Sequence, residues 1–392
     1  MRLKNKAKIM VGAVIVPICL CIGLQLFMGL VIFSAHAWAG NWRNISAGDM
    51  RIELYVPATA PKLADKRALM ISLHGCVQTN TVLRDQGNWS ATADEYGMVV
   101  ALPAVPDGGK IAGCWDYFGR AAPFSPPLPP HTRNSRDNDN LLALVESLQA
   151  DTALNIDPAQ TYITGLSSGG GQTLVMGCLA PEIFAGIGIN AGPTIGTGSH
   201  EINPPDFASL PITPAQAKAI CQDLAGTHSP AFGTQLASVI YGSKDQTVDP
   251  RYNHLNAEIM TSIYGVSDKA GFPVNELPGH NPRGTGELWS DGTGPRFSLI
   301  RNDGLGHAWP SGSGQGGEIN FVAREGVNYP AYVTRFFFEN NRRVQKNPPP
   351  SISANAEVES LQVKISGIAI DDGKVTDITI HITGLIKDFS EG

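Results

Sequence analysis

The sequence predicts an α/β fold in which a mostly parallel sheet is covered by helices on both faces. Apolar and β-branched runs of strand length alternate with longer segments of helical periodicity, and parallel strands require connections of that length. Strands buried on both faces are apolar throughout, as residues 68–73 are. Leaving out the first 39 of the 392 residues leaves 353, enough for one core of roughly 300 residues and an appendage.

The first 39 residues have the composition of a signal peptide. A basic start is followed by an apolar stretch over 9–33, and small residues precede possible cleavage points after Ala37 and Ala39. We therefore expect the protein to be secreted, to the periplasm or outside the cell. The apolar stretch is also long enough to span a bilayer, so a membrane anchor formed by an uncleaved leader is the alternative.

Strands and helices alternate between residues 51 and 150. The helix nearest the end of this region carries its leucines and Val145 on one stripe, with Asp137 or Asn138 as its cap, and a proline-rich loop over 123–130 precedes it. The expected elements are strands over 51–56, 68–73 and 98–102 and helices over 88–96 and 137–150.

Residues 161–171 predict a tight strand-to-helix turn around Ser167. A β-branched run breaks into Gly165, Leu166, Ser167, Ser168 and Gly169, which is the spacing of a nucleophile elbow. Glycine is needed on either side because a Cβ would collide with the strained turn or with the neighbouring strand. The turn places the Ser167 hydroxyl above the carboxyl edge of the sheet and the Ser168 amide at a helix N-terminus, facing a developing negative charge. A glycine-rich loop without chemistry is the alternative for this motif alone.

Two later segments carry the groups that a serine nucleophile needs. A strand over 237–242 runs into a turn with Asp245, and a strand over 297–300 leads to the glycine-flanked His307. An imidazole removes the serine proton, and a carboxylate holds that imidazole in the required tautomer. A turn aspartate or a loop histidine is commonplace by itself. Their order after Ser167 and their positions at strand ends predict a catalytic triad of Ser167, Asp245 and His307.

The loop after the strand over 68–73 is expected to supply a second oxyanion-hole donor. Gly75 permits close approach of the backbone, so the amide of Cys76 is the candidate beside that of Ser168. His74 is expected to stabilise the loop by hydrogen bonding and to take no part in proton transfer.

The second half of the chain continues the alternation and then changes character. A proline-rich linker over 344–350 is followed by residues 351–392, whose β-type runs look like the start of a fibronectin type III or immunoglobulin-like module. This segment is too short for a complete sandwich of about 100 residues. The other expected elements are a strand over 186–191 and helices over 214–224 and 330–339.

The motifs LHGC, GLSSGG, YGSKDQTV and GLGHAWP, with residues 113–118, resemble the esterase family of extracellular poly(3-hydroxybutyrate) depolymerases and their feruloyl and acetylxylan esterase relatives over about residues 41–340. The resemblance implies an α/β-hydrolase fold, and it maps Ser167, Asp245 and His307 onto the triad and Cys76 onto the oxyanion hole. It implies a serine esterase that hydrolyses ester bonds of poly(3-hydroxybutyrate) or its oligomers through an acyl-enzyme. Feruloyl or acetylxylan ester hydrolysis is the second interpretation, and a non-catalytic surface-binding protein is a distant third.

Aromatic residues near these motifs are candidates for the substrate cleft. Trp115, Tyr117, Phe118 and Trp309 would line it, and ordinary packing in the core is the equally open alternative.

Four cysteines remain after the leader, at positions 76, 114, 178 and 221. An even number in an exported chain predicts two disulfides, with three possible pairings. We favour Cys76 with Cys114, which ties the oxyanion loop to the Trp115 loop, and Cys178 with Cys221, which ties the nucleophile helix to the helix over 214–224. Four small buried thiols are the alternative.

Charge and composition narrow the range of partners. The formal charge of −6 becomes −10 when the four basic residues of the leader are left out, and the sequence has no basic patch, so no nucleic-acid partner is expected. No ligand cluster with metal spacing is evident, so neither a metal nor an organic cofactor is expected. The expected partner is an ester polymer or oligomer, with no stable membrane association once the leader is cleaved.

Overall fold

The computed structural model describes residues 40–119, 128–205 and 208–344, together with strands over 351–359, 362–371 and 374–383. The predicted signal peptide over 1–39, most of the proline-rich loop and the linker from 345 to 350 lie outside the described residues.

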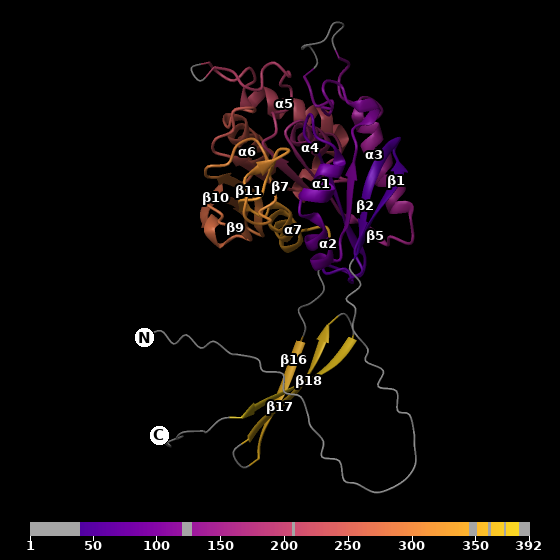
Figure 1. Cartoon of the computed structure of the whole chain (residues 1–392), viewed down its shortest axis with the longest axis vertical. Helices are drawn as coiled ribbons and strands as arrows, with labels where there is room; N and C mark the ends of the chain where they lie inside the picture. The colour runs from indigo at the N-terminus through magenta and orange to yellow at the C-terminus, as the bar shows by residue number, and fades with distance from the viewer. Residues whose placement is uncertain are drawn as a thin grey trace. The chain divides into compact units, whose positions relative to one another are not determined.

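A ten-stranded sheet forms the centre of the part between residues 40 and 344, with the order β1-β2-β4-β3-β5-β6-β7-β11-β10-β8 (Figure 1). The six strands from β4 to β11 in this order run parallel, and the pairs at both edges are antiparallel. The mostly parallel sheet is therefore confirmed. The strands are β1 (Asn41–Ala47), β2 (Met50–Val56), β3 (Arg67–Leu73), β4 (Val99–Pro103), β5 (Ile156–Leu166), β6 (Gly186–Asn190), β7 (Leu236–Gly242), β8 (Asp268–Pro273), β10 (Gly284–Asp291) and β11 (Gly294–Asn302).

Helices cover both faces of this sheet, as strand β6 shows. Neighbouring residues of a strand point to opposite faces. Ile187 meets α4, where a Cβ on Gly177 would lie 2.7 Å from the Ile187 side chain, whereas a Cβ on Gly186 would lie 2.7 Å from the ring of Phe337 in α7. Helices α4 and α7 therefore lie on opposite sides. The helices are α1 (Asn80–Gln86), α2 (Trp89–Tyr96), α3 (Asp137–Ala150), α4 (Ser168–Leu179), α5 (Pro214–Ala225), α6 (Arg251–Tyr264) and α7 (Tyr329–Asn340).

Several of these elements were not predicted from the sequence. The antiparallel strands β10 and β8, which extend the sheet at one edge, are among them. Strand β8 could not be predicted because it is mostly exposed and shows no apolar alternation that would mark it as a strand. Five short strands, four of them after β11 and one before β10, form two further small sheets. They are β12 (Trp309–Pro310), β13 (Glu318–Ile319) and β14 (Val322–Ala323) in one small sheet, and β9 (Gly279–His280) with β15 (Gly326–Val327) in another.

Two arginines fix the end of this part of the chain, just after α7. Arg342 forms hydrogen bonds of 2.7 Å to both carboxylate oxygens of Asp291 at the end of β10, and these bonds hold the pKa of that carboxyl well below its usual range. Arg343 donates to the carbonyl oxygens of Pro181 and Glu182, which follow α4.

The C-terminal strands form a separate three-stranded antiparallel sheet of β16 (Ser351–Glu359), β17 (Gln362–Asp371) and β18 (Lys374–Thr383). The expected β-type character is present. A sandwich of the immunoglobulin type needs about seven strands, so the assignment to such a module stays a prediction.

Candidate active site

The turn at Ser167 joins β5 to α4 through a strained backbone. Ser167 has φ 58° and ψ −119°, a combination that is unusual for a residue with a side chain. A Cβ on Gly165 would lie 2.4 Å from the carbonyl oxygen of Gly169, and one on Gly169 would lie 2.6 Å from the carbonyl oxygen of His74. Both glycines are therefore required sterically, for the reason expected from the sequence.

Asp245 and His307 form a buried pair at the same edge of the sheet. Nδ1 of His307 lies 2.7 Å from Oδ2 of Asp245, and the two side chains are 7% and 0% exposed. The other carboxylate oxygen accepts hydrogen bonds from the amides of Thr247 (2.9 Å) and Val248 (3.0 Å). The carboxylate is thus fixed from three sides, and it fixes the ring of His307 with Nδ1 as the donor.

Asn190, at the end of β6, connects the serine turn to the histidine loop. Its carbonyl oxygen accepts the amide of Ser167 at 2.9 Å, and its side-chain Nδ2 donates to the carbonyl oxygen of Ala308 at 3.1 Å. Asn190 is fully buried. The sequence analysis missed this residue, because an asparagine at a strand end carries no distinctive signal.

The loop after β3 packs directly against Ser167. A Cβ on Gly75 would lie 3.3 Å from the Cβ of Ser167, a tight contact that shows how closely this loop passes the serine. The Gly75 amide donates to Oε1 of Gln78 at 2.8 Å, which closes a tight turn around Cys76. The second candidate donor, the amide of Ser168, belongs to the first residue of α4, where backbone amides have no acceptor within the helix.

His74 stabilises this loop with both ring nitrogens. Nε2 accepts the amide of Val105 at 3.2 Å, so Nδ1 carries the proton and donates to the carbonyl oxygen of Gly75 at 2.8 Å. Burial lowers the pKa of the His74 imidazole, while the bond to Gly75 acts in the opposite direction. The ring is therefore neutral near pH 7, and its contacts fit the stabilising role expected from the sequence.

A buried ion pair that the sequence analysis did not anticipate holds the loop around Trp115. Arg136 binds both carboxylate oxygens of Asp116 and also donates to the carbonyl oxygens of Asp116 and Phe118. The two side chains are 3% and 6% exposed. The amide of Trp115 in turn lies 3.4 Å from Oγ of Ser168, so the pair supports the residue next to Ser167, the predicted nucleophile.

The aromatic residues expected in the cleft are buried in packed positions. Trp115 and Trp309 are fully buried and Tyr117 is 3% exposed. The Trp115 ring lies 5.6 Å from that of His74, Trp309 donates its ring N–H to the carbonyl oxygen of Gly87, and Tyr117 packs on Gly171. The expectation that they contact substrate is corrected accordingly: rings without exposed surface serve packing, the alternative that the sequence left open.

Both favoured disulfides are formed. Cys76 joins Cys114, and Cys178 in α4 joins Cys221 in α5. The first bond links the oxyanion loop to the loop that Arg136 holds. The second links α4, which begins directly after Ser167, to α5.

One wall of the site is a hairpin of β13 and β14 that the sequence did not predict. Its Phe321 ring lies 6.4 Å from that of His307. The carboxylate of Glu318 approaches Gly306, and burial, aided by the charge of Asp245 and opposed by that of His307, raises the pKa of Glu318. Gln78 donates to the carbonyl oxygen of Asn320 at 2.6 Å and so ties this hairpin to the oxyanion loop.

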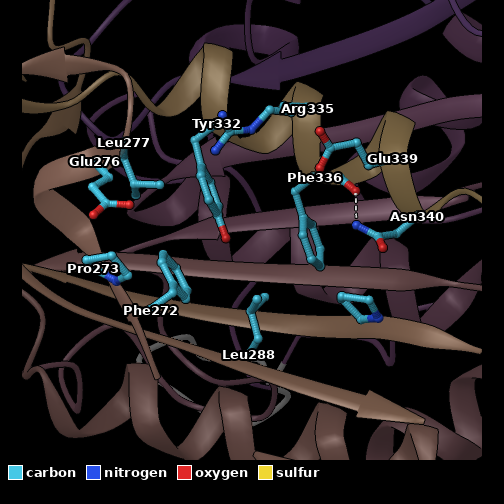
Figure 2. Close-up of a pocket in the computed structure, with 11 residues that line it drawn as sticks. Phe272, Pro273, Glu276, Leu277, Leu288, Tyr332, Arg335, Phe336, Glu339 and Asn340 are labelled. Carbon is cyan, nitrogen blue, oxygen red and sulfur yellow. Dashed lines mark hydrogen bonds between the residues drawn. The ribbon is translucent and has the colours of Figure 1, made fainter. Parts of the chain in front are cut away.

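A cavity of about 400 Å³ lies apart from these residues, between α7 and the strands β8 and β10. Figure 2 shows the rings of Phe272, Tyr332 and Phe336 along it, and the planes of neighbouring rings are within 11° of parallel. It shares no lining residue with the predicted triad.

Within the described ranges, no group of three or more His, Cys, Asp or Glu side chains is arranged to hold a metal ion. No helix in those ranges is both apolar enough and long enough to cross a bilayer.

Comparisons with known proteins find similar chains among depolymerases and esterases. The family model described as esterase PHB depolymerase matches residues 50–211. A poly(3-hydroxybutyrate) depolymerase of Ralstonia pickettii is 35% identical over 350 residues, which cover 86% of this chain and 68% of that protein. Acetylxylan esterase A of Talaromyces purpureogenus is 26% identical, over 73% of this chain and 75% of its own. The structure of an acetyl xylan esterase from Aspergillus awamori superposes with a TM-score of 0.52 at 18% identity, covering 68% of this chain and 94% of that one, and supports the fold alone.

Proposed function

The chain belongs to the esterase PHB depolymerase family and is an esterase with the α/β-hydrolase fold, and we propose that it is a secreted serine esterase that hydrolyses poly(3-hydroxybutyrate) or its oligomers. The observation that carries the catalytic part is the buried His307–Asp245 pair beside the strained Ser167 turn, with Asn190 bonded to both loops. The R. pickettii relative supports the choice of substrate.

In the proposed reaction, Oγ of Ser167 attacks the ester carbonyl carbon while Nε2 of His307 accepts the serine proton. The amides of Ser168 and Cys76 donate to the oxyanion that forms. As the oxyanion collapses, the bond to the alcohol oxygen breaks, and His307 protonates that alcohol. Water then attacks the acyl-serine with His307 again as the base, which releases the acid and restores Ser167. Asp245 stabilises the imidazolium at both stages.

The proposed organisation follows the sequence boundaries: a signal peptide over 1–39, a catalytic domain over 40–343, a linker over 344–350 and a partial β module over 351–392. The two disulfides support an oxidising destination such as the periplasm or the extracellular space.

Hydrolysis of p-nitrophenyl butyrate tests the catalytic assignment. We expect Ser167→Ala and His307→Ala to lower kcat by at least about 10⁴-fold, because the triad acts as a unit. His280→Ala is the matched control, since its Nδ1 lies 2.9 Å from Glu325 in another histidine–carboxylate pair that is more exposed. Equal rates for wild type and Ser167→Ala would refute the proposal.

A second experiment tests the substrate. We expect clearing of a poly(3-hydroxybutyrate) suspension, with little release of ferulate from methyl ferulate or of acetate from acetylated xylan. The T. purpureogenus relative makes acetylxylan hydrolysis the second candidate. Faster release of acetate than of hydroxybutyrate would assign the enzyme to that class.

A further inference from the structure

Glu318 brings a carboxylate to the edge of the predicted active site. It lies on β13, and its Oε2 would be 3.3 Å from a Cβ on Gly306, the residue before His307. We propose that Glu318 is a specificity-determining residue whose negative charge disfavours esters with a free carboxylate on the leaving alcohol. The inference rests on the proposed function and deepens it, because it states which ester bonds of a polyester the site favours.

The hairpin that carries Glu318 is fixed beside the histidine loop. The amide of Trp309 donates to the carbonyl oxygen of Phe321 at 2.7 Å, and β12, which begins shortly after His307, pairs with β14. Within the hairpin, Glu318 lies opposite Ala323. The ring of Phe321 meets that of His307 edge-on at 6.4 Å. These contacts hold the backbone at Glu318 next to the loop of the predicted catalytic histidine.

The charge of Glu318 is coupled to the predicted catalytic pair. Partial burial raises the pKa of the Glu318 carboxyl, the charge of His307 lowers it, and the charge of Asp245 raises it further. Within the described residues Glu318 forms no ion pair, even though Lys244 adjoins Asp245 and Arg324 follows β14 directly. Its side chain is exposed. The carboxylate therefore presents a negative charge to a substrate that lies beside His307.

The leaving alcohol is the part of the substrate that His307 faces. In the proposed reaction His307 protonates the alcohol oxygen as the ester bond breaks, so this oxygen must come within hydrogen-bond reach of Nε2. In a 3-hydroxybutyrate unit, two carbon atoms separate that oxygen from the carboxyl carbon. A free carboxylate on the unit therefore stays near His307, beside the hairpin that carries Glu318.

Repulsion at this place distinguishes one ester bond of a polyester chain from the others. Like charges repel more strongly in a partly buried site than in bulk water. An internal bond has an uncharged ester on the leaving unit, whereas the last bond before the carboxyl end has an anion there. Glu318 thus disfavours the last bond and directs the enzyme to internal bonds.

Two small esters isolate this effect. 3-Butyryloxybutyrate and 3-butyryloxybutyramide each contain one ester bond and form the same butyryl-enzyme, and they differ in the charge of the leaving alcohol. The measured quantity is the charge ratio, which is kcat/KM for the amide divided by kcat/KM for the acid, for the full-length protein at pH 8 and low salt. Glu318→Gln keeps the shape of the side chain and removes its charge, and we expect it to lower the charge ratio at least about threefold.

Three controls test whether the charge at this position is responsible. Glu318→Asp keeps the charge and should retain a higher charge ratio than Glu318→Gln. Glu276→Gln removes the same charge at the cavity in Figure 2, away from the predicted triad, and its charge ratio should stay within about 1.5-fold of wild type. Salt at about 0.5 M should narrow the difference between wild type and Glu318→Gln, because ions screen the charge of an exposed carboxylate.

A charge ratio in Glu318→Gln equal to that of wild type would overturn the inference. So would an equal fall in Glu276→Gln, which would assign the effect to net charge, or a fall that salt does not change, which would assign it to shape. Failure of the proposed function is distinct. Wild type would lack activity on p-nitrophenyl butyrate, which would remove both, or would act on the small esters but not on the polymer, in which case the charge ratio still decides this inference.

Discussion

Removal of the Arg136 guanidinium should destabilise the domain more than any change at an exposed ion pair. In Arg136→Met the carboxylate of Asp116, 6% exposed, loses both of its bonds to the guanidinium, and the carbonyl oxygens of Asp116 and Phe118 lose a donor. Leaving a buried charge without its partner costs about 3–5 kcal/mol. We expect the free energy of unfolding to fall by about that amount.

Equilibrium unfolding in urea, followed by the fluorescence of the buried tryptophans, measures the change. Arg301→Met is the matched control, because Arg301 pairs with Asp303 at 2.9 Å while both side chains are more than 40% exposed. Exposed pairs contribute about 0–1 kcal/mol. The double variant Asp116→Asn/Arg136→Met should cost less than Arg136→Met alone, because it leaves no unpaired charge. A cost for Arg136→Met no greater than that for Arg301→Met would refute this account of the loop.

Three further predictions concern the folded domain. Because burial lowers the pKa of His74, the unfolded state takes up a proton on this imidazole before the folded state does as the pH falls below about 6.5. The free energy of unfolding, measured by urea titration, should therefore fall from pH 7.5 to pH 5, and by more in wild type than in His74→Gln. Equal dependence on pH in the two proteins would show that His74 does not contribute to this loss. The paired change Cys178→Ala/Cys221→Ala should lower the free energy of unfolding by about 2–5 kcal/mol, and an unchanged urea midpoint would contradict a structural role for this disulfide. In Gly171→Ala the new Cβ would meet the ring of Tyr117 at 2.8 Å, so we expect a loss of about 1–3 kcal/mol in the same assay, and a gain in stability would show that the ring moves freely.

The sequence predicts those parts of the molecule whose signals are local. The strand-to-helix turn at Ser167 follows from two glycines with a steric necessity, and the parallel strands follow from their continuous apolar runs. Asp245 and His307 were identified by their order along the chain and their positions at strand ends, and the structure brings the two side chains to 2.7 Å from each other.

Features that depend on long-range contacts were not predictable in this way. The roles of Asn190 and Arg136 follow from hydrogen bonds to residues in other loops, Ala308 and Asp116 respectively. An asparagine or an arginine at these positions has no sequence signal that would predict such bonds. Strand β8 is held by backbone pairing with β10, and its side chains carry no pattern. The aromatic residues of the Trp115 loop illustrate the opposite error, since a Trp near a catalytic motif has the same sequence signal whether it faces solvent or the core.

The arginine pair after α7 has a mechanical consequence. The residues directly after α7 are held on two sides, by the bonds of Arg342 to Asp291 and by the bonds of Arg343 to the carbonyl oxygens of Pro181 and Glu182. Unwinding of the last turn of α7 from its C-terminal end would therefore require that bonds to a β-hairpin and to the turn after α4 break as well.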